Sequence, residues 1–186
     1  MLNKAFDLIY VNGYQATSID EIIATTKVTK GAFYYHFGSK EQMGLAVINE
    51  IIYPETYQGL ILPLKGSDKP VKDIYKMIKN ILFDSSFFKV ENGCPLSNLI
   101  QEMSPLIEEF AIALNTMTDQ CLEALKESLK QARKAGKIRS GINEREVAYF
   151  IFSGYWGVRN LGKMQNSQEC YFIYLEELKR YLKSLQ

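Results

Sequence analysis

Residues 28–41 hold side chains of the kind that bind nucleic acid. In a helix turning 100° per residue from Thr29, the side chains of Gly31, Ala32 and Tyr35 share one side. Small residues on that side allow close approach, and hydroxyl, imidazole and ammonium groups at its edges donate hydrogen bonds. A surface of this shape suits the major groove of DNA, which is just wide enough for a helix. Thr29 and His36 flank that side along one edge, and Lys30 and Tyr34 flank it along the other.

Two helix starts beside this surface are candidate phosphate sites. Lys40 would put its ammonium next to the free backbone amides that begin the following helix. Thr17 and Ser18 offer hydroxyls and amides at the start of the preceding helix in the same way. Residues 22–40 contain three lysines and no acid, although residues 1–50 carry four lysines against five acids. The local positive charge is what a phosphate would experience.

Four short helices are expected to position these groups. The first spans 2–12 and ends at Gly13, and a capping box of Ser18 and Glu21 begins the second. The third covers 29–36, where Phe33 and Phe37 point inward. A second capping box, Ser39 with Gln42, starts a fourth helix that runs until near Pro54. Two helices joined by a tight turn, with the second one presented outward, form a helix-turn-helix.

The rest of the chain predicts a second, larger helical unit. No alternating strand pattern of useful length occurs, so we expect an all-α fold with a DNA-binding domain at 1–50 and a larger helical domain at 51–186. The expected helices of the second domain are 70–88, 96–103, a long helix from Pro105 to about Gly136, 144–163 and 168–184.

Composition narrows the class of protein. A net charge of +1 and 47% apolar residues are ordinary for a globular chain, and no apolar run is long enough to cross a bilayer. Three widely spaced cysteines suggest reduced thiols and a cytoplasmic location. The single histidine rules out a histidine-based metal cluster, and no P-loop or dinucleotide fingerprint is present. We therefore expect no catalysis, no metal and no cofactor.

The order of these residues resembles a known family. Gly13-Tyr14-x-x-Thr17-Ser18-Ile19-x-x-Ile22, followed by Val28-Thr29-Lys30-Gly31-Ala32-Phe33-Tyr34-Tyr35-His36-Phe37-x-Ser39-Lys40-Glu41, is similar to the DNA-binding domain of the TetR/AcrR repressors. The resemblance implies that Thr29, Lys30, Ala32, Tyr35 and His36 face bases or nearby phosphates, and that Tyr34 and Lys40 hold the DNA backbone. The stretch Gly93-Cys94-Pro95-Leu96-x-Asn98-Leu99-x-Gln101-Glu102 resembles the C-terminal domain of one TetR subgroup. Lys27 departs from the pattern, because many members have a glycine in this turn. A positive φ at Lys27 would therefore strain the backbone.

The last two helices carry apolar stripes, and the sequence offers no third helix to cover them. The resemblance also implies a homodimer. Two helices from each protomer would then form a four-helix bundle. The other reading is that the stripes are buried inside one protomer. The residues expected at a dimer interface are Val147, Ile151, Gly154, Val158, Leu161, Tyr171, Tyr174, Leu178 and Leu182.

The resemblance further implies an inducer cavity in the larger domain. Apolar groups would line it, and three polar residues beside the 93–95 break would orient a small hydrophobic or amphipathic ligand. The residues expected there are Phe83, Phe87, Asn98, Gln101, Glu102, Met117, Cys121, Tyr155 and Trp156. A ligand that prefers one of two dimer arrangements would lower operator affinity, and the fourth helix would transmit the change.

Two alternatives stay open. A regulator could sense redox state through Cys94 or Cys121. A helical dimer could also bind a small molecule without binding DNA.

Overall fold

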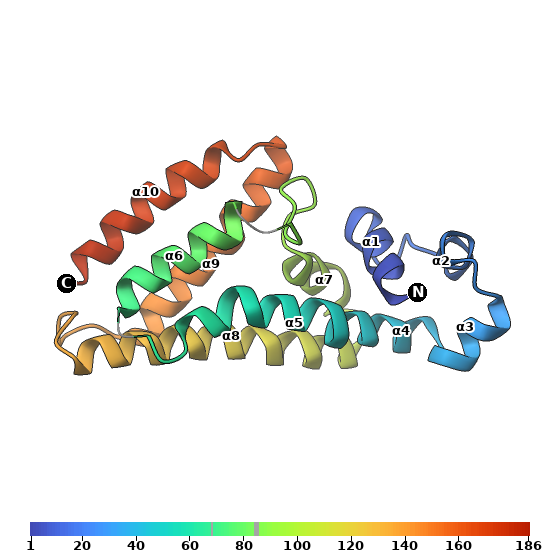
Figure 1. Cartoon of the computed structure of the whole chain (residues 1–186), viewed down its shortest axis with the longest axis horizontal. Coiled ribbons are helices and arrows are strands. Elements are labelled where there is room, and N and C mark those ends of the chain that lie inside the picture. Colours follow the sequence, from blue (N-terminus) through green and yellow to red (C-terminus); the bar gives the residue numbers. More distant parts are fainter. Residues whose placement is uncertain (68, 84–85) are drawn as a thin grey trace. The chain divides into compact units, whose positions relative to one another are not determined.

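A computed structural model describes residues 1–67, 69–83 and 86–186, and every regular element in these ranges is a helix. Figure 1 labels the helices in chain order. Their bounds are α1 (Leu2–Asn12), α2 (Ile19–Thr26), α3 (Lys30–Phe37), α4 (Lys40–Val47), α5 (Tyr53–Thr56), α6 (Pro70–Phe83), α7 (Pro95–Met103), α8 (Glu108–Lys134), α9 (Glu144–Gln165) and α10 (Glu169–Ser184). Within the described ranges, no helix has the length and apolar character that crossing a membrane requires.

The chain divides into two compact units. Unit 1 comprises Met1–Glu55 and Pro95–Met117, and unit 2 comprises Thr56–Cys94 and Thr118–Gln186. The first segment of unit 1 ends close to the boundary expected from the sequence. Unit 1 also contains α7 and the start of α8, which the sequence analysis assigned to the larger domain.

The first three helices of unit 1 follow from apolar spacing in α1 and from side-chain caps at the starts of α2 and α3. Ala5, Phe6, Ile9 and Tyr10 are the buried face of α1, as the spacing predicts. Ser18 caps α2 in a full capping box with Glu21. The Thr29 hydroxyl accepts a hydrogen bond from the Ala32 amide (3.2 Å) and begins α3.

The fourth helix is longer than expected. The helical path continues past Pro54 through α5, with π-helical turns at Ile48–Ile52 and Tyr57–Ile61, and ends in a 3₁₀ turn at Leu62–Leu64. A proline ring clashes with the carbonyl four residues earlier in a regular α-helix, and wider turns on either side relieve that clash. The expectation of a stop near Pro54 was therefore wrong.

Two further helix bounds differ from the prediction. α6 ends at Phe83, residues 86–88 are not helical, and residues 84–85 of the expected helix lie outside the described residues. α8 begins at Glu108 rather than at Pro105.

Unit 2 contains the core that the last two helices build. α10 packs on both α9 and α6. The buried stripe of α9 and α10 faces this core, so most of the expected dimer-interface residues are inside the protomer. The buried ones are Val147, Ile151, Val158, Tyr171, Leu178 and Leu182.

The remaining three interface candidates differ among themselves. Tyr174 is half-buried and its hydroxyl donates to the Ile151 carbonyl (2.9 Å). Gly154 leaves room for the Tyr174 ring, because a Cβ on Gly154 would lie 2.7 Å from it. Only Leu161 is exposed. The expected stripe is thus part of the protomer core, because α9 and α10 pack on each other and α10 packs on α6.

Candidate nucleic-acid interface

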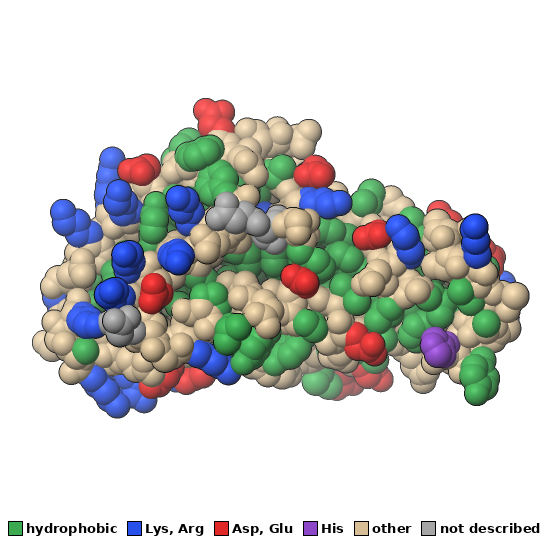
Figure 2. Space-filling view, viewed as in Figure 1, with side chains coloured by type: hydrophobic (Ala, Val, Ile, Leu, Met, Phe, Trp, Pro, Cys, Tyr) green, Lys and Arg blue, Asp and Glu red, His purple; other side chains and the backbone are tan. Residues whose placement is uncertain are grey.

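The outward face of α3 is open to solvent as the sequence predicts. Tyr35 is 92% exposed, and Ala32 and His36 are also exposed. A Cβ added to Gly31 would meet nothing within 4 Å, so this side of the helix is slim. Figure 2 shows the single histidine, His36, in purple at the surface of the molecule.

The opposite face of α3 anchors the helix. Phe33 is completely buried, and its ring lies 5.6 Å from the half-buried ring of Phe37. Tyr34 touches Phe33 edge-on, with ring centroids 5.4 Å apart, and remains 44% exposed. The predicted division of α3 into an aromatic inner face and a small, polar outer face is confirmed.

The turn before α3 contains the backbone feature expected to be strained. Lys27 has φ 56° and ψ 26°, which is the left-handed region. A lysine costs more there than a glycine because its Cβ crowds the backbone. The turn nevertheless places α2 and α3 in contact as a helix-turn-helix requires.

An acid just outside the 22–40 window pairs with Lys30. The Lys30 ammonium lies 3.1 Å from an Asp20 carboxylate oxygen, and both side chains are well exposed. This hydrogen bond and the Asp20 charge raise the pKa of Lys30. Asp20 lies in α2, before the acid-free stretch 22–40. Counting charges in that stretch alone therefore misses an acid of α2 that pairs with a lysine of α3.

Lys40 lies against the turn between α1 and α2. Its ammonium is 4.5 Å from the centroid of the Tyr14 ring and donates to the Gln15 carbonyl (3.4 Å). Partial burial lowers the pKa of Lys40, while the charges of Glu41, Glu102 and Glu21 act in the opposite direction. The Tyr14 ring and the Gln15 carbonyl therefore hold the ammonium in place.

The two candidate phosphate sites at helix starts are partly occupied by the protein itself. The Thr17 hydroxyl is buried and donates to the Gly13 carbonyl (2.7 Å), so the expectation that it is offered to DNA is wrong. The Ser18 hydroxyl exchanges hydrogen bonds with Glu21 in the capping box. At the start of α4, the Glu41 carboxylate accepts hydrogen bonds from the Glu41 backbone amide and from the Ser39 side chain, and these lower the pKa of Glu41.

Glu102 of α7 has a role that the sequence analysis did not anticipate. One carboxylate oxygen accepts the Tyr14 amide (2.9 Å) and the other accepts the Gln15 amide (2.8 Å). Both oxygens are thus engaged by the backbone of the α1–α2 turn, which differs from the expected role of orienting a ligand. The partners are 88 and 87 positions apart in the chain, so no local pattern could have indicated the contact.

The other residues predicted to contact a ligand are divided between the two units. Asn98, Gln101 and Met117 belong to unit 1, and the Gln101 amide donates to the Ser97 hydroxyl (3.1 Å). In unit 2, Cys121 and Tyr155 are buried and Trp156 is half-buried.

The two aromatic residues predicted for the cavity from the 83–88 segment of unit 2 make ring contacts. Phe83 packs on the ring of Phe172 (4.6 Å between centroids), and Phe87 packs on Phe88 (5.0 Å). The expected lining of a ligand cavity stays a prediction.

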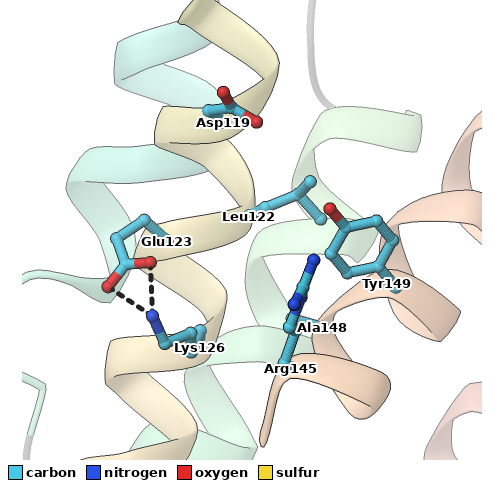
Figure 3. Close-up of a pocket in the computed structure, with 7 residues that line it drawn as sticks. All are labelled: Asp119, Leu122, Glu123, Lys126, Arg145, Ala148 and Tyr149. Carbon is cyan, nitrogen blue, oxygen red and sulfur yellow. Dashed lines mark hydrogen bonds and ion pairs between the residues drawn. The ribbon is translucent and has the colours of Figure 1, made fainter.

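Unit 2 has a surface pocket of about 290 Å³ between α8 and α9 that shares no residue with that set. Figure 3 shows Lys126 bound to Glu123, with Arg145 beside Tyr149 on the facing helix. Its lining is largely charged, whereas small-molecule sites are mostly apolar. Among the described residues, no group of histidine, cysteine or acidic side chains could hold a metal ion.

Two of the three cysteine thiols are buried. Cys94 and Cys121 are each 1% exposed. Burial, aided by the neighbouring Cys94, raises the pKa of the Cys121 thiol to about 12. The thiolate is the reactive form of cysteine, so this environment disfavours oxidation of Cys121 at neutral pH.

The chain is similar to known HTH-type transcriptional regulators. It is 34% identical over 131 residues to an uncharacterized HTH-type transcriptional regulator in the lacX 3′ region of Lactococcus lactis subsp. lactis, covering 69% of this chain and 66% of that protein. It is 24% identical over 170 residues to the HTH-type transcriptional repressor DhaR of Mycobacterium sp. (strain GP1), covering 91% and 83%.

A TetR transcriptional regulator from Chloroflexus aurantiacus J-10-FL has the same fold. Its crystal structure superposes with a TM-score of 0.87 over 98% of this chain and 91% of that one, at 22% identity.

Two family models match most of the chain. Residues 1–47 match the model of bacterial regulatory proteins of the tetR family. Residues 74–174 match the tetracyclin repressor-like C-terminal domain. Together with the exposed recognition surface of α3, these matches establish that the chain is a DNA-binding transcriptional regulator of the TetR family.

Proposed function

We propose that this regulator is a homodimeric repressor that binds its operator through α3 and leaves it when a small hydrophobic or amphipathic ligand binds. The observation that carries the proposal is the outward face of α3. It presents a 92% exposed Tyr35 beside a glycine and an alanine, while Phe33 fixes the helix from behind. An exposed aromatic ring on so slim a face has no packing role in the protomer.

A homodimer would bring two such helices to one operator. Half-sites read by helix-turn-helix dimers lie about 34 Å apart, or a multiple of that distance. The surface that supports dimerisation is a second stripe of α9, formed by the exposed residues Phe150, Gly157, Leu161 and Met164. These residues share one side of a helix by their spacing. A Cβ on Gly157 would meet nothing within 4 Å, so another backbone can approach there.

Ligand release follows from two dimer arrangements with different operator affinities. A ligand that binds better to the weaker-binding arrangement lowers operator affinity by its differential affinity for the two, typically about 1–3 kcal/mol. The similarity to DhaR, an HTH-type transcriptional repressor, supports the repressor part of this proposal.

The test is a binding titration on duplex DNA flanking the gene of this protein. Tyr35→Ala and His36→Ala should each weaken binding by about 5- to 150-fold, which corresponds to losing about 1–3 kcal/mol of contact free energy. Tyr149→Ala is the matched control, because Tyr149 is an exposed tyrosine of unit 2 and should leave affinity unchanged. Wild-type affinity in both α3 variants would refute the recognition surface.

The same titration at several salt concentrations tests the phosphate contacts. Affinity should fall as salt rises, because lysines that neutralise phosphates release counterions. Lys40→Gln should flatten the slope by about 2 in a dimer, since each protomer loses one contact. A slope that does not change in this variant would show that Lys40 does not bind a phosphate.

A further inference from the structure

Side chains from three helices meet at the turn formed by residues 13–15. From α7, the Glu102 carboxylate accepts the Tyr14 amide at 2.9 Å and the Gln15 amide at 2.8 Å. A Cβ on Gly13 would lie 3.2 Å from each Glu102 oxygen, and φ at Gly13 is +90°. A glycine at this position thus lets the carboxylate approach the backbone closely.

The other contacts of this turn come from α4 and α8. Lys40 of α4 donates to the Gln15 carbonyl and lies over the Tyr14 ring. Phe110 of α8 packs edge-on against the same ring, with centroids 5.1 Å apart. Gly44 makes room for this contact, because a Cβ there would lie 2.5 Å from Phe110 and 2.7 Å from Tyr14. The turn is therefore held by α7 and α8, and it also contacts Lys40, the lysine proposed to bind a phosphate.

The segment that leads into α7 is held at its other end. In unit 2, the completely buried Arg159 of α9 donates to the carbonyls of Phe88 (2.9 Å), Lys89 (3.0 Å) and Gly93. α7 begins two residues after Gly93, at Pro95. The stretch 88–103 thus carries one anchor to α9 near its start and one anchor to the α1–α2 turn near its end.

We propose that Glu102 is a positioning residue for DNA binding, which transmits displacements of α7 to the α1–α2 turn and so to Lys40 and α2. The partly buried Tyr14 amide must keep its hydrogen-bond partner, and the Gln15 amide holds the second oxygen of the same carboxylate, so the turn follows the carboxylate when α7 shifts. This inference rests on the proposed function and names the link by which that function is regulated. The link is reciprocal, so operator binding must also be felt in α7.

Glu102→Gln is the informative substitution. Glutamine keeps the length of the side chain but has one acceptor oxygen, and its NH₂ group would face the second amide donor. We expect operator affinity to fall by about fivefold or more, the lower end of the range for coupled sites. Glu109→Gln is the matched control, since it removes one exposed carboxylate from the same unit and should leave operator affinity unchanged.

A second measurement separates coupling from a purely structural role. Amide hydrogen exchange is followed in the full-length protein, free and saturated with duplex DNA flanking its gene. In the wild type, DNA should slow exchange in peptides covering α3 and also in peptides covering residues 95–103. In Glu102→Gln, saturating DNA should still protect α3 but should leave exchange in 95–103 unchanged.

The outcomes distinguish the inference from the function on which it rests. If DNA does not protect α3 in the wild type, the proposed function fails and this inference fails with it. If α3 is protected but 95–103 does not respond, or responds equally in wild type and variant, only the role of Glu102 is refuted. Glu102→Asp, which keeps the charge with a shorter reach, replaces Glu102→Gln if circular dichroism shows that the latter does not fold.

Discussion

Gly31→Ala should move stability and DNA affinity in opposite directions. Gly31 is the second residue of α3 and is exposed, with nothing within 4 Å of an added Cβ. In the free protein the methyl group therefore costs nothing sterically, and replacing a helical glycine stabilises the fold by about 0.5–1 kcal/mol. On DNA the same methyl group occupies the slim side that we expect to approach the bases.

The cost on DNA can be worked from close packing. Forcing an extra methyl group into a well-packed contact costs at least about 1 kcal/mol, which gives about 2 kcal/mol for two protomers. That corresponds to roughly a 30-fold loss of operator affinity. Urea denaturation measures the stability change, and fluorescence anisotropy with labelled duplex measures the affinity change.

Asn80→Ala is the control for this experiment. Asn80 is exposed in α6 of unit 2, so alanine should also stabilise the helix, by up to about 0.7 kcal/mol, without changing DNA binding. A Gly31→Ala protein that is more stable and binds DNA with unchanged affinity would refute the assignment of this face to the major groove.

Four other results are expected. Lys27→Gly should raise the free energy of unfolding by about 0.5–1 kcal/mol, measured by thermal denaturation, because it relieves the left-handed strain at φ 56° more than it increases unfolded-state entropy. Iodoacetamide at neutral pH should label the half-buried Cys170 before the buried Cys121, and mass spectrometry measures both rates. Rapid labelling of Cys121 would support the redox-sensing alternative. The pKa of Cys121 is raised from 9.0 to about 12 in the folded protein, so its contribution to stability should be present below pH 9 and be lost as pH rises towards 12. Leu161→Arg should convert the dimer to monomers in sedimentation velocity, whereas Leu106→Arg, at an exposed leucine of unit 1, should not; a dimeric Leu161→Arg protein would contradict the α9 surface.

Helix periodicity and capping patterns were sufficient to predict which side chains of α3 are exposed. The period of 3.6 residues separates Phe33 and Phe37 from Tyr35, and the structure follows it. The Ser18–Glu21 capping box is also present as the spacing predicts. These features depend on residues within one turn of each other, where sequence patterns carry most of the physical information.

Contacts between residues far apart in the chain could not be predicted from these local patterns. α9 has two apolar stripes, and periodicity does not say which one is buried within the protomer. The sequence analysis selected the stripe of Val147 and Ile151, which packs inside unit 2, whereas Leu161 lies on the stripe that stays exposed. Sequence patterns could not indicate the Glu102 contact either, because it joins the end of α7 to the α1–α2 turn, far away in the chain.

Cross-linking from position 35 tests the central claim most directly. A photoreactive p-benzoylphenylalanine replaces Tyr35 in one protein and the exposed Tyr149 of unit 2 in another, and each is irradiated with duplex DNA flanking the gene. The account predicts covalent attachment from position 35 to bases within two operator half-sites and none from position 149. Bound DNA that cross-links equally from both positions, or from neither, would contradict the claim that the outward face of α3 reads the operator.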